Sequence, residues 1–273
     1  MTGNGGHDPV NAISEAAATG VVAETFADIR RTMGIPLITS IWRTLVAVDG
    51  GLDATWRATR PLYRTGQPEA ALAALVARAE LPEPGVPVGR LEAAGVAPEE
   101  RATIQAILDV YNRSNGINFL ALTALVTAPA GEPSDYPSAL PLPEWPELPR
   151  LLEQHDIAPA TWDLLLAVNG FGASPGESGL ATLWRHLAPW PGLLGVIHDG
   201  LEPMQASGAI DRAIGQVMEI AAVEGARLAH HRAGPLELPA AARAMIANYV
   251  TNPGLVARMV TLGHGVTGWL RRA

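Results

Sequence analysis

The sequence contains neither cysteine nor lysine, and each absence excludes a class of chemistry. Without cysteine there are no disulfides, thiol nucleophiles or iron–sulfur clusters. Without lysine there is no Schiff base, and therefore no covalent attachment of pyridoxal phosphate. All nineteen basic residues are arginine. The side chains left for chemistry are carboxylates, histidines, hydroxyls, amides and arginines.

Excess positive charge and long apolar runs are also lacking. The 273 residues carry a formal net charge of −8, which argues against nucleic acid as a partner because phosphate binding depends on clustered positive charge. No apolar run reaches the roughly 18 residues that a membrane helix needs. The first residues lack the basic region and apolar stretch of a secretory signal. We therefore expect a cytoplasmic protein with no membrane partner.

Alternation of period two is almost absent, whereas apolar residues at helical spacing recur along nearly the whole chain. The sequence therefore predicts an all-α protein. We expect the helix that covers residues 98–126 to be bent or broken near Asn115 and Gly116, because glycine is a poor helix former. The other expected helices cover residues 15–33, 37–48, 52–64, 67–79, 159–170, 179–188, 191–206, 209–232, 239–250 and 253–270.

The sequence contains an internal repeat. Residues 41–62 align without a gap on residues 183–204, at an offset of about 142 residues. A weaker match aligns residues 111–125 with residues 249–263. The identical pairs of the first match are Trp42 and Trp184, Arg43 and Arg185, Leu45 and Leu187, Gly50 and Gly192, Leu52 and Leu194, and Pro61 and Pro203. This pattern predicts two homologous helical halves that form an intramolecular pseudo-dimer.

A proline-rich segment separates the two halves. Seven prolines fall between residues 129 and 149, and proline fixes φ and removes a backbone donor, so this segment is expected to be a stiff linker. The predicted units are an N-terminal repeat (1–128), the linker (129–149) and a C-terminal repeat (150–273). We call the contact region between the repeats the seam. Pockets favour such interfaces, so the seam is where a binding site is expected.

Common site motifs are missing. No HExxH motif and no pair of histidines four residues apart is present, so no metal is expected, although His186, His198 and His264 could meet in space. The sequence contains no phosphate-binding loop and no dinucleotide-binding fingerprint, which would each follow a strand. No GxSxG nucleophile elbow occurs. No cofactor is therefore expected.

Residues 111–118, YNRSNGIN, place three amides and a phenol in a helix that is otherwise apolar on nearly every face. Such a helix is buried, and buried amides need hydrogen-bond partners or a polar cavity. Two interpretations follow. In the first, Asn112 and Asn115 bridge a helix break. In the second, an amide faces a closed pocket, where it holds a water or a carboxylate oxygen.

The segments DIRRTMGIPLITSIWRTLVAVDGG, YNRSNGINFLALTAL and LWRHLAPWPGLLGVI resemble the group I 2-haloacid dehalogenases. The resemblance covers both halves and the proline-rich joint. It implies an all-α protein of two related halves with the active site between them. In that family an aspartate activates a water that attacks the halogen-bearing carbon directly, and an asparagine helps to hold the water. The substrates are small 2-haloacids.

The resemblance places the family's asparagine at Asn115, which is the candidate catalytic residue. It places the family's aspartate at Leu183, between Thr182 and Trp184, and a leucine cannot accept a proton from water. The candidate ligand-binding residues are Thr182, Leu183, Trp184, Tyr249, Ser40 and Asn118. If the ligand is an anion, Arg43, Arg113 or Arg185 could supply the positive charge.

Three functions follow from this resemblance and its departures. The first is a divergent homologue with a pocket for a small organic acid or a small apolar ligand between the halves. The second is an active dehalogenase, a hydrolase acting on carbon–halide bonds, that uses another acid such as Glu177. The third is a non-catalytic binding or structural protein. The sequence leaves open whether the chain is an enzyme, and it is compatible with a homo-oligomer.

Overall fold

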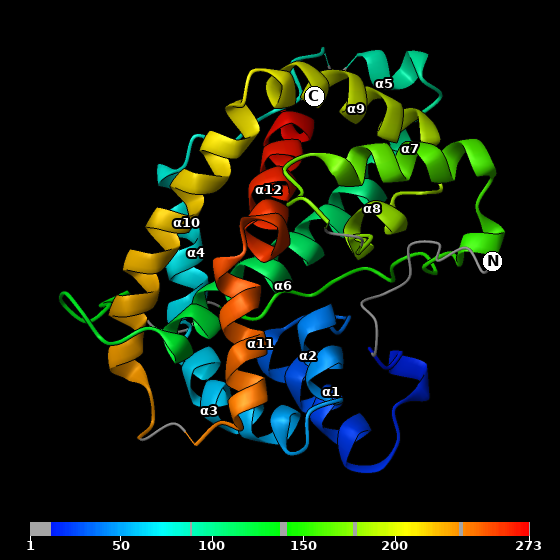
Figure 1. The fold of residues 1–273 in the computed structure, drawn as a ribbon. Coiled ribbons are helices and arrows are strands. Elements are labelled where there is room, and N and C mark those ends of the chain that lie inside the picture. Colours follow the sequence, from blue (N-terminus) through cyan, green and yellow to red (C-terminus); the bar gives the residue numbers. More distant parts are fainter. Residues whose placement is uncertain (1–11, 88, 137–140, 177–178, 235–236, 273) are drawn as a thin grey trace.

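Helices form all the regular structure in the described residues, which are 12–87, 89–136, 141–176, 179–234 and 237–272 of this computed structural model (Figure 1). Across these ranges there are twelve α-helices and no strand. The all-α prediction is therefore confirmed.

The helices before the proline-rich segment are α1 (Gly20–Met33), α2 (Ser40–Leu45), α3 (Gly51–Arg64), α4 (Gln67–Arg78), α5 (Arg90–Ala93) and α6 (Arg101–Val126). Those after it are α7 (Pro159–Gly170), α8 (Thr182–His186), α9 (Pro191–Ala206), α10 (Ala209–Leu228), α11 (Ala240–Thr251) and α12 (Arg258–Arg271). Single 3-10 turns lie at Glu15–Ala17, Pro98–Glu100, Gln154–Asp156 and Ala229–His231, and Pro253–Ala257 is π-helical.

Helix α6 lies at the centre of the molecule and packs against α4, α10, α11 and α12 (Figure 1). Every residue from Gly116 to Leu125 is buried, as expected of a helix that is apolar on all sides. Helix α1 packs on α3, α7 packs on α9, and α11 reaches α2 and α3. The two predicted repeats thus share one hydrophobic core. Their duplication and pseudo-dimer arrangement stay a prediction.

The predicted break near Asn115 and Gly116 is wrong, because α6 runs unbroken from Arg101 to Val126. Gly116 has a packing role against helix α4 instead of breaking α6. A Cβ atom at Gly116 would overlap the Leu72 side chain, so the glycine serves close helix packing. The flanking amides bond to groups outside α6: Asn112 donates to Gly263 O and Thr267 Oγ1, and Asn118 bonds to three other residues. They therefore do not compete with the helix for its own backbone.

Other boundaries move by a few residues. The expected helix 15–33 is a 3-10 turn followed by α1, since Thr19 between them is extended. The helices expected at 37–48 and 179–188 are the much shorter α2 and α8. Helix α5 was not predicted. Because α5 packs on α9, its stability comes from a distant contact rather than from its own four residues.

The proline-rich segment is tied to both repeats. None of its described residues is helical. Gln67 Nε2 donates to Tyr136 O at 2.6 Å, Trp145 Nε1 donates to Gly34 O at 2.9 Å, and Pro149 O is 2.7 Å from His186 Nε2. These hydrogen bonds hold the proline-rich segment against both repeats. Within the described ranges, every helix is too short or too polar to cross a membrane.

Candidate functional site

Two short helices, α2 and α8, hold matching positions of the internal repeat. Their first residues are Ser40 and Thr182, and both side chains are partly exposed. The tryptophans two residues later, Trp42 and Trp184, are completely buried. Both rings therefore belong to the hydrophobic core. Each helix is thus anchored by its indole and presents a hydroxyl at its N-terminal end.

Around α2 the buried polar groups satisfy one another. Asn118 Oδ1 accepts from Trp42 Nε1 at 3.1 Å and from Tyr63 Oη at 2.8 Å, and Asn118 Nδ2 donates to Thr39 Oγ1 at 2.8 Å. Trp42 meets Trp56 edge to face with ring centroids 5.5 Å apart. These bonds leave only one N–H of the Asn118 amide without a partner. The geometry favours a structural role for Asn118, and its binding of a ligand stays a prediction.

Tyr249 belongs to the same side of the molecule although it comes from α11. This helix packs on α2 and α3. Burial raises the pKa of the Tyr249 phenol. Burial, together with the neighbouring Tyr249, also raises the pKa of Tyr63 well above its usual range. Both phenols therefore stay protonated and can donate hydrogen bonds. Tyr249 thus lies near the aromatic cluster of Trp42, Trp56 and Tyr63.

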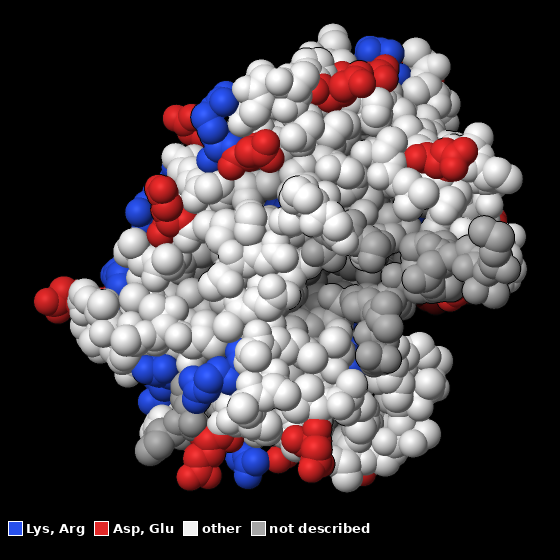
Figure 2. Space-filling model, viewed as in Figure 1, with Lys and Arg blue, Asp and Glu red and all other residues white. Residues whose placement is uncertain are grey.

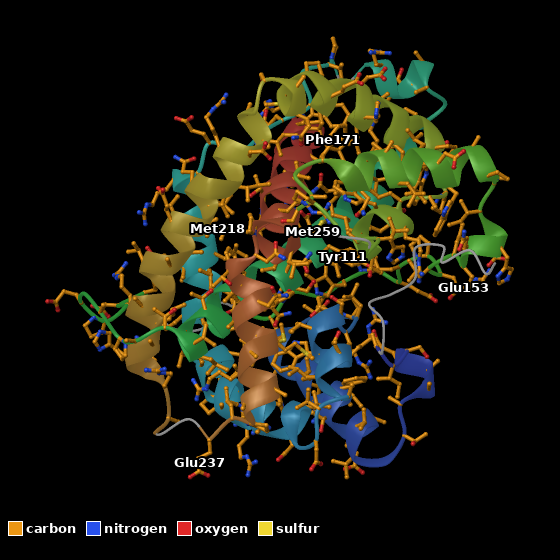
Figure 3. All side chains as sticks on the ribbon, in the orientation of Figure 1. Tyr111, Glu153, Phe171, Met218, Glu237 and Met259 are labelled. Atoms are coloured by element: carbon orange, nitrogen blue, oxygen red, sulfur yellow. The ribbon has the colours of Figure 1, made fainter. Side chains whose placement is uncertain are left out.

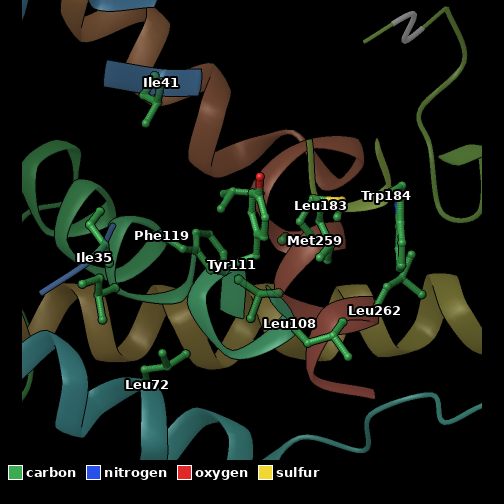
Figure 4. Packing of buried hydrophobic residues seen from close by; sticks show 14 of the residues in the cluster. Ile35, Ile41, Leu72, Leu108, Tyr111, Phe119, Leu183, Trp184, Met259 and Leu262 are labelled. Carbon is green, nitrogen blue, oxygen red and sulfur yellow. The ribbon is translucent and has the colours of Figure 1, made fainter. Parts of the chain in front are cut away.

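Around α8 the surroundings are mainly apolar. Figure 4 shows Leu183, Met259 and Tyr111 close together, with Trp184 and Leu262 beside them. Leu183 is 1% exposed and lies next to Gly263 of α12, where a Cβ atom would be 3.6 Å from Leu183 Cδ2. The position that the resemblance assigns to a general base is therefore filled by a leucine in the apolar core.

Two donors on α8 lack acceptors. The buried Trp184 Nε1 has no hydrogen-bond partner in the described part of the chain. Arg185 is 9% exposed, its Nε is also without an acceptor, and its guanidinium forms no ion pair with any described residue. Burying an arginine without a counter-ion is costly. These donors therefore mark a place where an acceptor, preferably an anion, would be stabilised.

The other two candidate arginines differ from Arg185. Arg113 Nη2 pairs with Glu69 Oε1 at 2.8 Å, and its Nε donates to Met33 O. Its charge is thus already neutralised. Arg43 is as buried as Arg185, and it has an interaction partner of its own. Of the three arginines, Arg185 is therefore the best candidate to bind an anionic ligand.

The phenol of Tyr111 and the imidazole of His186 connect α6 with α8. Tyr111 Oη is 3.2 Å from His186 Nδ1, and His186 Nε2 is 2.7 Å from Pro149 O. A carbonyl oxygen can only accept, so Nε2 carries the proton and Nδ1 accepts from the phenol. Burial lowers the pKa of His186, and the nearby Arg185 charge lowers it further. The imidazole is therefore neutral at pH 7.

Asn115 lies on α6 between these two environments. It follows Tyr111 by one helical turn, and residues four apart on a helix share a face. Its side chain is partly exposed and makes no hydrogen bond to any other described residue. Tyr111 lies on the side of α6 on which α8 packs, since it bonds to His186, and helix spacing puts Asn115 on the same face of α6. We call Asn115, Thr182, Leu183, Trp184 and Arg185 the seam site.

One face of the molecule is indented. Figure 2 shows a hollow between the part that holds α1–α3 and the part that holds α7–α9, and charged side chains gather mainly near the edge of this face. Figure 3 places Tyr111 and Met259 near the middle of the same view. Ser40, Asn118 and Tyr249 lie towards the aromatic cluster rather than on α8. Glu177 lies outside the described residues.

A cavity of about 480 Å³ opens beside α1 and α3. Its polar groups are largely paired, since Arg31 and Arg60 both contact Asp28, and these contacts, chiefly with Arg60, lower the pKa of Asp28 to about 2. It is lined by Asp28, Arg31, Thr32, Arg60, Tyr63, Arg64, Gly66, Glu69 and Leu142. None of the candidate site residues lines it.

The histidines do not meet as metal ligands would. His186 bonds to Tyr111 and Pro149, whereas His198 packs against Phe171 with ring centroids 5.4 Å apart. Across the described ranges, no three histidine, aspartate or glutamate side chains gather closely enough to hold an ion. The pairing of His186 with Tyr111 was not predicted, because no sequence spacing connects residues 75 positions apart.

Comparison with known proteins places the fold. No protein-family model matches the sequence, and no curated protein matches it. Among solved structures, a D-2-haloacid dehalogenase mutant in complex with D-2-CPA has a TM-score of 0.72 at 17% identity, covering 96% of this chain and 95% of that one. A D-2-haloacid dehalogenase with L-LA has a TM-score of 0.73 at 16% identity, with the same coverage. The chain therefore has the fold of the D-2-haloacid dehalogenases over nearly its whole length.

Proposed function

We propose that this protein binds a small organic acid at the seam site and is a divergent relative of the 2-haloacid dehalogenases. The observation that carries the proposal is Arg185, a residue only 9% exposed whose Nε has no acceptor and whose charge no described carboxylate neutralises. A ligand carboxylate would supply the missing charge, and arginine binds carboxylates through two parallel hydrogen bonds. An apolar ligand would leave this charge unpaired, so the acid is preferred.

Neighbouring groups suit such a ligand. The Trp184 indole adds a second donor that has no acceptor among the described residues, and the Thr182 hydroxyl stands at the start of the same helix. Leu183 and Met259 offer apolar surface for a short carbon chain. The solved structures with this fold hold D-2-CPA and L-LA, which gives a starting set of ligands.

Calorimetric titration with racemic 2-chloropropionate tests the proposal. We expect saturable binding of one molecule per chain. Arg185→Gln should weaken it by about 10- to 100-fold, since hydrogen bonds to charged groups contribute roughly 1.5–3 kcal/mol. Arg57→Gln is the matched control, because Arg57 is exposed and its one ion pair within the described residues is with Asp53, four residues away on α3. Absence of binding heat, or equal loss in both variants, would contradict the proposal.

Two other functions remain testable. An active dehalogenase that uses Glu177 predicts halide release that Glu177→Gln abolishes. A purely structural protein predicts that Asn115 is bonded to backbone inside a dry seam. The side chain of Asn115 has no such bond to the described residues, which favours a ligand site over the structural alternative.

A further inference from the structure

Water activation at the seam site requires a proton acceptor, and Leu183 cannot serve. The most buried carboxylates that the structure describes form ion pairs with arginines away from α8. Glu69 pairs with Arg113 at 2.8 Å, and Glu224 pairs with Arg78 at 2.9 Å. Neither carboxylate contacts α8. A proton acceptor other than these two carboxylates is therefore needed.

The pair of Tyr111 and His186 has the geometry of a proton relay. His186 holds its proton on Nε2, where Pro149 O accepts it at 2.7 Å, and this bond leaves the Nδ1 lone pair directed at the phenol. The rings meet edge to face with centroids 5.8 Å apart. Among the described residues, Tyr111 and Arg185 are the titratable or charged groups that face this imidazole. A neutral imidazole in this tautomer can take the phenolic proton.

The relay lies beside the seam site on both helices. Tyr111 is one turn from Asn115 on α6, and His186 is one turn from Leu183 on α8. Figure 4 shows the Tyr111 ring next to Leu183 and Met259, with its hydroxyl directed away from Leu108. A water held by the Asn115 amide would therefore lie on the side of α6 that carries this phenol.

We infer that Tyr111 and His186 together act as the general base for hydrolysis of a 2-haloacid at the seam site, an inference that rests on the binding function proposed above. Water gives a proton to Tyr111 Oη as Tyr111 gives its own proton to His186 Nδ1. The water oxygen forms a bond to C2, and the carbon–halogen bond breaks with its electron pair on the departing halide. The products are the 2-hydroxyacid, halide and a proton on His186 that passes to solvent.

Tyr111 is the catalytic residue in this scheme, and His186 acts through it. Protonation of His186 should stop the relay, so halide release should fall as the pH drops through the lowered pKa of this imidazole. A base consisting of a carboxylate would give a dependence that does not change when His186 is replaced. The pH profile thus separates a proton-accepting histidine from one that merely supports the fold.

The experiment measures halide release from racemic 2-chloropropionate across pH 4–9, with binding of the same ligand measured by calorimetry. The variants are Tyr111→Phe and His186→Asn, and the control is His155→Asn, since His155 is 82% exposed. General acid–base groups contribute roughly 10²- to 10⁴-fold. We expect each variant to lose at least about 100-fold in kcat with binding changed less than about threefold. His186→Asn should also lose the acidic limb of the profile.

The outcomes test the proton relay and the binding function separately. Binding without halide release in the unmodified protein would overturn the relay and leave the binding function standing. Halide release that persists in Tyr111→Phe would also overturn the relay. Neither binding nor release would overturn both. Circular dichroism and unchanged binding in the variants show that the loss is not a failure to fold.

Discussion

The two asparagines of α6, Asn115 and Asn118, should respond very differently to the same substitution. Asn118→Ala removes the shared acceptor of Trp42 Nε1 and Tyr63 Oη and the donor to Thr39 Oγ1, all of which are buried. Each buried donor left without an acceptor costs about 1–3 kcal/mol. Alanine returns roughly 0.5 kcal/mol of helix propensity. Two donors lose their acceptor, so we expect the free energy of unfolding to fall by about 1.5–5.5 kcal/mol.

Asn115→Ala is the matched control, because it makes the same change one turn away where the side chain has no hydrogen bond within the described residues. Its free energy of unfolding should change by less than about 0.5 kcal/mol. Urea denaturation followed by circular dichroism at 222 nm measures both. Equal destabilisation by the two substitutions would refute the assignment of Asn118 to the structure and of Asn115 to the site.

Three further predictions concern packing and charge. Gly265→Ala should destabilise the protein by about 2 kcal/mol, because a Cβ atom would overlap the Pro82 carbonyl. Gly215→Ala on α10, with open space around it, should stabilise the protein by up to about 1 kcal/mol. Urea denaturation measures the free energy of unfolding of both variants. Burial lowers the pKa of His264 from 6.5 to about 4, so the unfolded chain binds a proton first and stability should fall between pH 6.5 and 4. His264→Gln should remove roughly 2 kcal/mol of that loss in denaturation at pH 7.5 and 5, and an unchanged pH dependence would contradict this. Glu224→Gln should cost about 2 kcal/mol by the same assay, since it leaves two arginines without their buried partner.

Local signals predicted much of the helix pattern. The predicted helices 159–170 and 191–206 match α7 and α9 to the residue, because Pro159 and Pro191 fix φ at the first helical position. These features depend on neighbours within a few residues.

Long-range contacts account for the errors and omissions. The break expected at Gly116 does not occur because Leu72 of α4 occupies the space beside the glycine. The pairing of Tyr111 with His186 depends on how α8 packs on α6. Residues 115 and 182–184 could be selected from the sequence through the family resemblance, and Arg185 was one of three arginines considered for an anion. That Arg185 has no counter-ion among the described residues is visible only when its surroundings are known.

A crystal structure of the protein with racemic 2-chloropropionate bound tests the central claim most directly. We predict the ligand carboxylate within about 3 Å of the Arg185 guanidinium nitrogens, with C2 on the side of α6 that carries Asn115 and Tyr111. A ligand bound elsewhere, or a seam in which Arg185 remains buried without an anion at saturating ligand, would contradict the proposed site.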